Sequence, residues 1–173
     1  MTFHPSQSNL TLIGMPGSGK STIGVLLAKA MRMHFVDTDV CIQAGEGRSL
    51  REIIDARGLE GFLAVEEQYL LCLDGRNSVI ATGGSAIYSE PAMRRLKASG
   101  PVVFLDVPLA ELRRRLGDWH DRGVVLAGGD DLETLLQTRR PMYERYADFT
   151  IAGLNKSHEQ IVTEVMRLLD ILP

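Results

Sequence analysis

The chain contains few residues of the kinds that mark a secreted, disulfide-bonded or membrane-embedded protein. Its two cysteines, Cys41 and Cys72, have no CxxC spacing and no adjacent histidine, which predicts free thiols rather than a disulfide framework. No apolar run approaches the roughly 18 residues that a membrane span needs, and residues 1–10 lack the basic start and apolar stretch of a secretory signal. We therefore expect a cytoplasmic protein with no membrane partner.

An excess of charge of one sign is also absent. The 19 Lys and Arg residues nearly balance the 22 Asp and Glu residues, which leaves a net charge of −3. Because proteins that grip nucleic acid are usually basic, this balance argues against a nucleic-acid partner, although it leaves local phosphate binding open. With 45% hydrophobic residues and no linker rich in Pro or Ser, the chain fits a single domain over residues 1–173, which we expect to be a monomer.

Short apolar runs alternate with longer amphipathic stretches, a pattern typical of helices packed on a mostly parallel sheet. The runs predict five strands, at residues 10–14, 34–37, 78–81, 102–106 and 148–151. The amphipathic stretches predict helices at residues 20–32, 49–57, 61–73, 90–98, 108–116, 131–146 and 157–169. Residues 117–130 contain four glycines and fit no element; either an ordinary surface connection or a mobile lid loop would account for them, and we expect the lid.

The strongest motif is the GxxxxGK[ST] pattern at residues 14–22, placed between an expected strand and an expected helix. Its glycines allow consecutive amides to point into one concavity, and the helix that follows adds its positive N-terminal dipole. Lys20 supplies a charge for the β and γ phosphate oxygens, and the Ser21 hydroxyl is a ligand for Mg²⁺. The residues expected to bind the nucleotide are Gly14, Met15, Pro16, Gly17, Ser18, Gly19, Lys20, Ser21 and Thr22.

Two carboxylates follow the second expected strand, in the sequence Asp37-Thr-Asp39. The period of two in extended chain predicts that both side chains lie on one side. Either residue could simply cap the helix that follows. The carboxyl ends of parallel strands are where ligands gather, however, so a functional role is favoured.

Together with two further segments, these motifs resemble the shikimate kinase family, whose P-loop fold is like that of nucleoside monophosphate kinases. The resemblance extends over residues 10–151 and is carried by the segment 14–22, by Asp37-Thr-Asp39, by Ala81-Thr-Gly83-Gly84 and by Arg139-Arg-Pro141-Met-Tyr143 followed by Ala147-Asp148. It implies a three-layer α/β/α P-loop fold with a five-stranded parallel sheet and a mobile lid. The implied activity is the ATP- and Mg²⁺-dependent phosphorylation of a small hydroxylated acid, shikimate to shikimate 3-phosphate, in amino-acid biosynthesis.

The resemblance also implies roles for individual residues. Lys20, Asp39 and Arg122 are implied to be catalytic, with Asp39 holding the acceptor hydroxyl and Arg122 closing over the phosphates. Ser21 and Asp37 would ligate Mg²⁺, directly or through its waters. Gly83 and Gly84 would offer backbone amides to the acceptor, Arg139 would bind its carboxylate, and Arg115 would stack on adenine.

These roles are chemically consistent, because phosphoryl transfer requires positioning and charge neutralisation more than covalent chemistry. Asp39, close to Mg²⁺ and Lys20, is expected to stay ionised and to orient the alcohol. Arg115 could instead be a solvated cation at the end of a helix, and Arg139 could be a surface residue.

Three departures from the family pattern lie on the acceptor and lid side. Leu63 occupies the position at which the family's Phe-Arg-x-x-Glu motif has the arginine that binds the acceptor carboxylate. Ser85 replaces a third glycine, and Arg122-Gly-Val-Val-Leu replaces the lid's Arg-Pro-Leu-Leu. If Leu63 faces that carboxylate, either Arg48 or Arg57 substitutes for the missing arginine or the acceptor differs.

Two alternative functions follow from these departures. A kinase of the same fold could phosphorylate another small hydroxy acid or amino acid, such as homoserine, whose ammonium Glu66 or Glu60 could meet. A non-catalytic ATP-binding regulator is the lower alternative, because such a protein would be expected to lose Lys20, Ser21 and Asp39 first.

Overall fold

A computed structural model describes residues 8–116, 131–153 and 155–171. Five parallel strands form one sheet in the order β2-β3-β1-β4-β5. The strands are β1 (Leu10–Ile13), β2 (His34–Asp37), β3 (Ser78–Ala81), β4 (Val102–Asp106) and β5 (Phe149–Ala152). All five strands expected from the sequence are therefore confirmed, with ends that differ by at most a residue.

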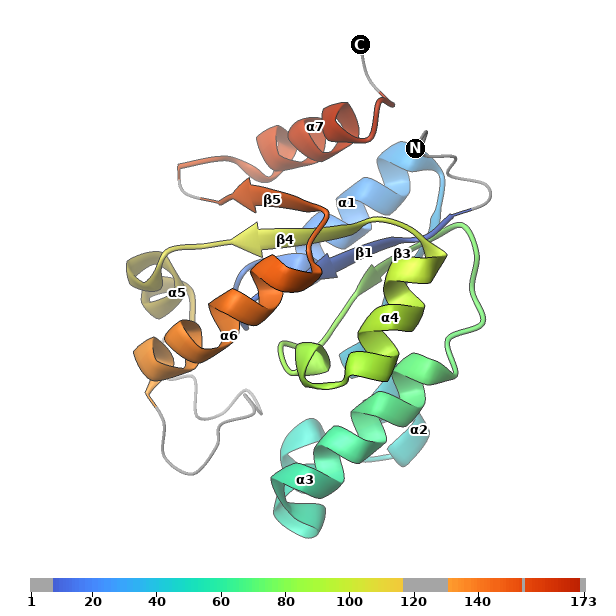
Figure 1. Ribbon diagram of the computed structural model, residues 1–173, viewed down its shortest axis with the longest axis vertical. Coiled ribbons are helices and arrows are strands. Elements are labelled where there is room, and N and C mark those ends of the chain that lie inside the picture. The colour runs from blue at the N-terminus through green and yellow to red at the C-terminus, as the bar shows by residue number, and fades with distance from the viewer. Residues whose placement is uncertain (1–7, 117–130, 154, 172–173) are drawn as a thin grey trace.

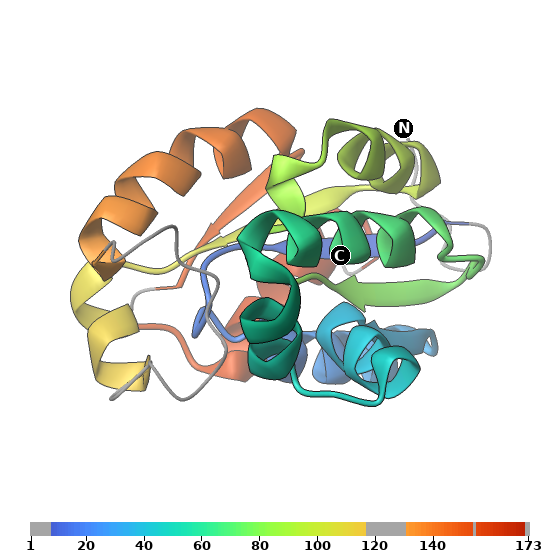
Figure 2. The ribbon, with the colours of Figure 1, turned by 90° about the horizontal axis from the view of Figure 1, so that it is seen from below.

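Helices cover both faces of the sheet, as Figures 1 and 2 show. They are α1 (Lys20–Met31), α2 (Thr38–Glu46), α3 (Leu50–Leu71), the 3-10 turn η1 (Ala86–Tyr88), α4 (Glu90–Ser99), α5 (Leu109–Leu116), α6 (Leu132–Tyr146) and α7 (His158–Leu168). In Figure 2, α4 and α6 lie on one side of the strands and α1 and α7 on the other. The three-layer α/β/α arrangement is confirmed.

Side chains alternate between the two faces of the sheet along each strand, and this produces one apolar layer on each face. In β4, Val102 and Phe104 pack with α4, α5 and α6, whereas Val103 and Leu105 pack with α1 and α7. This is the period of two expected of a strand buried on both faces. None of the helices in the described part of the chain has the length and apolar character needed to cross a membrane.

The segment between β2 and β3 differs from the expectation. Helix α2 begins directly after Asp37 and is absent from the expected helices, because it is short and its apolar face is narrow. The two helices expected at 49–57 and 61–73 form one element, α3, which is broken at Gly58. This break sets the direction of the second half of α3, which carries Phe62 and Glu66 toward the carboxyl ends of the strands.

The break in α3 is testable with two matched glycines. Gly58 has φ 70° and ψ 176°, a region open almost only to glycine, whereas Gly47 has φ 63° and ψ 26°, the left-handed region that asparagine tolerates. A Cβ atom at either position would meet nothing within 4 Å, so only the backbone conformation distinguishes them. We expect Gly58→Asn to lower the free energy of unfolding in urea by about 2–3 kcal/mol and Gly47→Asn by less than about 1 kcal/mol. Equal losses would show that the backbone at Gly58 is not strained for other residues.

Candidate active site

A pocket of about 940 Å³ opens at the carboxyl ends of the strands, between the glycine-rich turn after β1 and the helices α2, α3, α5 and α6. Open parallel sheets bind ligands at this edge. The site lies where the connection that leaves one strand passes over one face of the sheet and the connection that leaves its neighbour passes over the other face. The residues that line it are Pro16, Gly17, Gly19, Lys20, Ser21, Thr22, Asp39, Leu50, Phe62, Thr82, Gly83, Gly84, Ser85, Glu111, Arg114, Arg115, Leu116, Arg139, Gly153, Asn155, Lys156, Ser157 and His158. Residues from seven separate segments of the chain therefore meet in one cavity.

The glycine-rich turn has the geometry of a phosphate-binding loop. Gly14 has φ 146°, and a Cβ atom there would lie 2.8 Å from the Leu105 carbonyl oxygen, so the turn can pass this close to β4 only as glycine. Helix α1 starts immediately afterwards, and its N-cap, Gly19, offers no side-chain hydrogen bond. The first amides of α1 are thus available to phosphate oxygens.

Lys20 is buried at the base of this turn. Its Nζ atom donates hydrogen bonds to the carbonyl oxygens of Gly14 at 2.8 Å and Met15 at 2.9 Å. Burial lowers the pKa of Lys20 to about 8, and Asp39 and Asp37 oppose this shift. An anionic phosphate beside the ammonium would favour its charged form in the same way.

Ser21 and Asp37 form an oxygen pair suited to Mg²⁺. The Ser21 hydroxyl donates to Asp37 Oδ2 at 2.6 Å, while Asp37 Oδ1 accepts from the amides of Asp39 and Val40. Asp37 therefore caps α2, which confirms one of the two sequence-based interpretations, and it also contacts Ser21 of the phosphate turn, which is compatible with the other. Within the described residues no cluster of three or more His, Cys, Asp or Glu could hold a metal alone. Mg²⁺ commonly takes one or two protein oxygens and completes its shell with phosphate and water, which is what this pair offers.

Asp39 lies in the first turn of α2 and lines the pocket. It meets Asp37 because the helix starts between them, and not because both residues are extended, which corrects the strand-period argument. Burial raises the pKa of Asp39, and Lys20 opposes that shift. The nearby cations led to the expectation that Asp39 stays ionised, and its burial acts in the opposite direction.

The turn after β3, residues 82–85, forms the opposite wall. The Gly83 amide donates to Thr38 Oγ1 at 3.0 Å, and the Gly84 carbonyl accepts from the Tyr143 hydroxyl at 2.7 Å. The amide of Gly83 is thus engaged inside the protein, whereas that of Gly84 has no hydrogen-bond partner among the described residues. Of the two amides expected to meet the acceptor, Gly84 remains the candidate.

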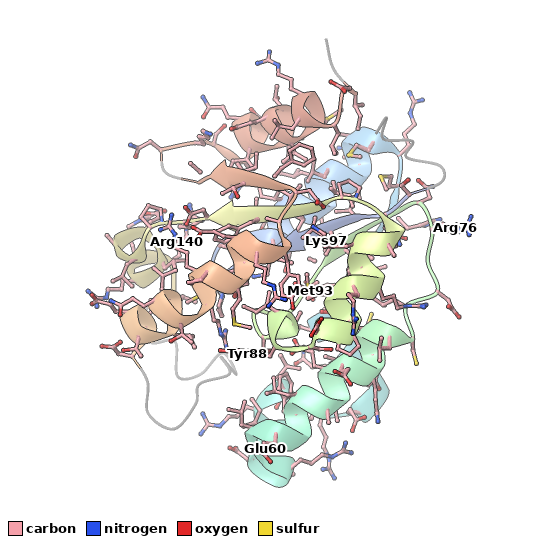
Figure 3. The ribbon with its side chains drawn as sticks, in the orientation of Figure 1. Glu60, Arg76, Tyr88, Met93, Lys97 and Arg140 are labelled. Atoms are coloured by element: carbon pink, nitrogen blue, oxygen red, sulfur yellow. The ribbon has the colours of Figure 1, made fainter. Side chains whose placement is uncertain are left out.

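Arg139 reaches this turn from α6. It is 1% exposed, which excludes the surface role, and its Nε donates to the Tyr88 hydroxyl at 3.1 Å. A Cβ atom at Gly84 would lie 3.1 Å from Arg139 Nη1, so the guanidinium sits against the turn. Figure 3 shows Tyr88 between α6 and α3, and Arg140 on the side of α6 that faces α5.

Glu66, which was expected to matter only for a homoserine acceptor, lies directly behind the turn at Gly83. Glu66 is 2% exposed, and its Oε1 has no hydrogen-bond partner among the described residues. Burial raises the pKa of Glu66 to about 7; the nearby Ser85 side chain opposes the shift, and Asp39 adds to it. In the sequence, the feature that could have identified Glu66 is that it shares a helix face with apolar residues of α3.

Arg115 lines the nucleotide end of the pocket. Its Nε donates to Glu111 at 2.7 Å, and its Nη1 donates to the Ser18 carbonyl at 3.3 Å. Glu111 also accepts two bonds from Arg114. Residues 155–158, which precede and begin α7, line the same end and were not anticipated. Arg122 and the expected lid, residues 117–130, lie outside the described residues.

The interpretation of Leu63 requires a correction. Leu63 does not line the pocket; it is half-buried and packs in the apolar cluster between α2 and α3. Phe62 and Leu50 instead provide an apolar wall. Neither Arg48 nor Arg57 replaces an arginine there, because both are exposed and outside the pocket lining, and Arg57 pairs with Glu46 at 2.8 Å.

Comparisons with known proteins agree with this geometry. A family model described as shikimate kinase matches residues 16–170. A shikimate kinase of Corynebacterium efficiens is 35% identical over 164 residues, which cover 93% of this chain and 96% of that protein. A shikimate kinase of a Synechococcus strain is 38% identical over 165 residues, or 94% and 84% of the two chains.

Solved structures give the same result. A shikimate kinase from Acinetobacter baumannii in complex with shikimate superposes with a TM-score of 0.88 at 29% identity, over 95% of this chain and 94% of that one. The enzyme from Aquifex aeolicus superposes with a TM-score of 0.81 at 33% identity, over 94% and 96%. A gluconokinase from Sinorhizobium meliloti, 22% identical with a TM-score of 0.55, shares the fold alone.

Burial of Glu66 makes a prediction about stability and pH. Because its pKa is raised from 4.5 to about 7 in the folded protein, the folded state binds the extra proton between these values, and stability falls as the pH rises through them. At pH 8, Glu66→Gln removes the buried charge and should raise the free energy of unfolding by an amount on the order of 3 kcal/mol. Near pH 4.5 the gain should be small. Urea unfolding at both pH values measures it.

Glu67→Gln is the matched control for this substitution. Glu67 lies next along α3 and is less buried, with its carboxylate bound by Ser89. Its substitution should give no gain that grows with pH. A pH-independent effect of Glu66→Gln would contradict the assignment of a costly buried charge.

Proposed function

Because this chain belongs to the shikimate kinase family, whose members are ATP-dependent kinases with an alcohol acceptor, we propose that it transfers the γ-phosphoryl group of Mg·ATP to a hydroxyl of shikimate. The observation that carries the proposal is that Lys20, Asp39 and Arg139 line one pocket. A phosphate site, a carboxylate for the alcohol and a cation for the acceptor's carboxylate are thereby brought together.

On the nucleotide side, the amides of the glycine-rich turn and of the start of α1 would hold the phosphates. Ser21 and Asp37 would hold Mg²⁺, which supplies charge neutralisation on the β and γ phosphates when bound. Lys20 adds a fixed cation at the same oxygens. Arg115, held by Glu111, would contact the adenine, and Arg122 would contribute a further cation to the phosphates.

On the acceptor side, Asp39 would accept a hydrogen bond from the reacting hydroxyl and orient its oxygen toward the γ-phosphorus. Since the transition state is loose, the hydroxyl proton leaves late, and Asp39 receives it. Arg139 would pair with the acceptor carboxylate in a charge-assisted hydrogen bond. The Gly84 amide would donate to a polar group of the acceptor.

The apolar wall supports a ring-shaped acceptor. Phe62, Leu50 and Pro16 present carbon surface to the pocket, which suits one face of a six-membered carbon ring better than a short flexible chain. The homoserine alternative depended on Leu63 facing the acceptor, and Leu63 packs elsewhere. The regulator alternative is opposed by the retention of Lys20, Ser21 and Asp39 in one site.

The activity can be tested by measuring ADP release from purified protein with Mg·ATP and shikimate, homoserine or gluconate. We expect turnover with shikimate and none above background with the other two. Turnover of homoserine with shikimate inert would refute the proposal. ATP binding without ADP release from any acceptor would favour the regulator.

Arg139 provides the sharpest test of the acceptor assignment. Loss of one charged hydrogen bond costs roughly 1.5–3 kcal/mol, so Arg139→Ala should raise the KM for shikimate about 10- to 100-fold and leave the KM for ATP nearly unchanged. Steady-state kinetics with each substrate varied in turn measure both values.

Arg140→Ala serves as the control for Arg139→Ala. Arg140 is the next residue on α6 and pairs outside the pocket with Asp106 and Glu144. Neither KM should change in this variant. A change confined to the KM for ATP in Arg139→Ala would remove Arg139 from the acceptor site.

A further inference from the structure

The guanidinium of Arg139 makes two contacts with one aromatic residue, Tyr88. Its Nε donates a hydrogen bond to the Tyr88 hydroxyl at 3.1 Å, and its Cζ lies 5.2 Å from the centroid of the Tyr88 ring. Tyr88 belongs to η1 and does not line the pocket, whereas Arg139 does. Because a guanidinium is planar and rigid, contacts that fix its Nε edge also fix the direction of its two terminal nitrogens.

The backbone on either side of Tyr88 is anchored. The Tyr88 amide donates to the Ser85 carbonyl at 2.9 Å, which joins η1 to the turn at residues 82–85. The next residue, Ser89, caps α4, and its hydroxyl also donates to Glu67 on α3. The Tyr88 side chain therefore belongs to a short segment that the turn and two helices hold in place, so its hydroxyl is a fixed acceptor for Arg139.

The same guanidinium also meets the turn at residues 82–85. A Cβ atom at Gly84 would lie 3.1 Å from Arg139 Nη1, so this terminal nitrogen lies against the turn. The Gly84 amide is the other group that we expect to contact the acceptor. The guanidinium thus extends from Tyr88 to Gly84, and its orientation is set at both places.

The contact with Tyr88 differs in charge from the pairing of another arginine on the same helix. Arg140, the next residue on α6, binds the carboxylates of Asp106 and Glu144, and such charge-assisted pairs offset the charge of the arginine. A phenol hydroxyl is neutral. Tyr88 therefore orients Arg139 without bringing an anion that competes with the carboxylate of an acceptor.

We propose that Tyr88 is a positioning residue for the acceptor: its hydroxyl and ring hold the Arg139 guanidinium in the orientation that meets the acceptor carboxylate. The kinetic consequences rest on the proposed function, whereas the contact itself does not. A cation that is already oriented costs less ordering free energy when the acceptor binds. The phosphate turn at residues 14–22 is a separate segment, so nucleotide binding should not depend on Tyr88.

The kinetic test compares two substitutions of Tyr88. Tyr88→Phe keeps the ring and removes the hydroxyl, and we expect it to raise the KM for shikimate about fivefold and the KM for ATP by less than about twofold. Tyr88→Leu also removes the ring contact and should raise the KM for shikimate about 20-fold. Because Tyr88 is 39% exposed, both variants should fold and keep the wild-type melting temperature within a few degrees.

Tyr146→Phe is the matched control. The ring of Tyr146 lies next to an arginine too, with Arg145 Cζ 5.6 Å from its centroid, but neither residue lines the pocket. Loss of the Tyr146 hydroxyl should leave both KM values unchanged.

A double-mutant cycle distinguishes positioning from a merely structural role. If Tyr88 acts through Arg139, the two substitutions are not additive, and Tyr88→Phe should raise the KM for shikimate no further in an Arg139→Ala background. The same fivefold rise in that background would overturn the proposal. A parallel rise in both KM values with a lower melting temperature would also overturn it.

A second readout needs no acceptor. The Nε proton of Arg139 is hydrogen-bonded and belongs to a side chain that is 1% exposed, so its exchange with water, followed by ¹⁵N NMR, should be slow. Exchange should be at least about fivefold faster in Tyr88→Phe and unchanged in Tyr146→Phe. Unchanged exchange in Tyr88→Phe would refute the contact. If the wild-type protein does not phosphorylate shikimate, the proposed function fails, and this measurement alone decides whether Tyr88 holds Arg139.

Discussion

The structure depends on one electrostatic constraint: the charges that phosphoryl transfer requires are buried together, at the carboxyl ends of a parallel sheet. Lys20, Asp39, Glu66 and Arg139 would each be costly to bury alone, because desolvation of an isolated charge costs several kcal/mol. At this edge of the sheet, Lys20 and Arg139 oppose the effect of burial on the pKa of Glu66, and Asp39 and Glu66 oppose it at Lys20. The opposing shifts at Lys20 and Glu66 show that this compensation is partial, and the remaining cost is typical of a site built for chemistry rather than for stability.

The same constraint explains the glycines and the aromatic residues around the pocket. Gly83 and Gly84 leave room for Glu66 and Arg139 to approach the turn from its two sides. Tyr143, stacked on Phe104 of the sheet with ring centroids 5.0 Å apart, fixes the turn through the Gly84 carbonyl. Packing in the core thus restrains the turn at residues 82–85. Restraint of this kind allows a scaffold to hold reacting groups to within a fraction of an ångström.

Much of the fold and the phosphate site could be predicted from the sequence. Strand periodicity and the GxxxxGK[ST] pattern are local signals, so the five strands and the location of Lys20 and Ser21 at the pocket follow from neighbouring residues. The location of Arg139 at the pocket was also foreseen, but only through the family resemblance.

The errors concern contacts between segments distant in sequence. Leu63 was expected at the acceptor, and its true location depends on how α3 turns at Gly58 and packs on α2. The engagement of the Gly83 amide by Thr38 depends in the same way on tertiary packing, which no local pattern encodes.

The most direct measurement of the central claim is a crystal structure of the protein with Mg²⁺, a non-hydrolysable ATP analogue and shikimate. The account predicts the γ-phosphate at Lys20 and the glycine-rich turn, the shikimate carboxylate at Arg139, and one ring hydroxyl hydrogen-bonded to Asp39 and directed at the γ-phosphorus. Shikimate bound elsewhere, or bound with every hydroxyl out of reach of Asp39, would contradict it.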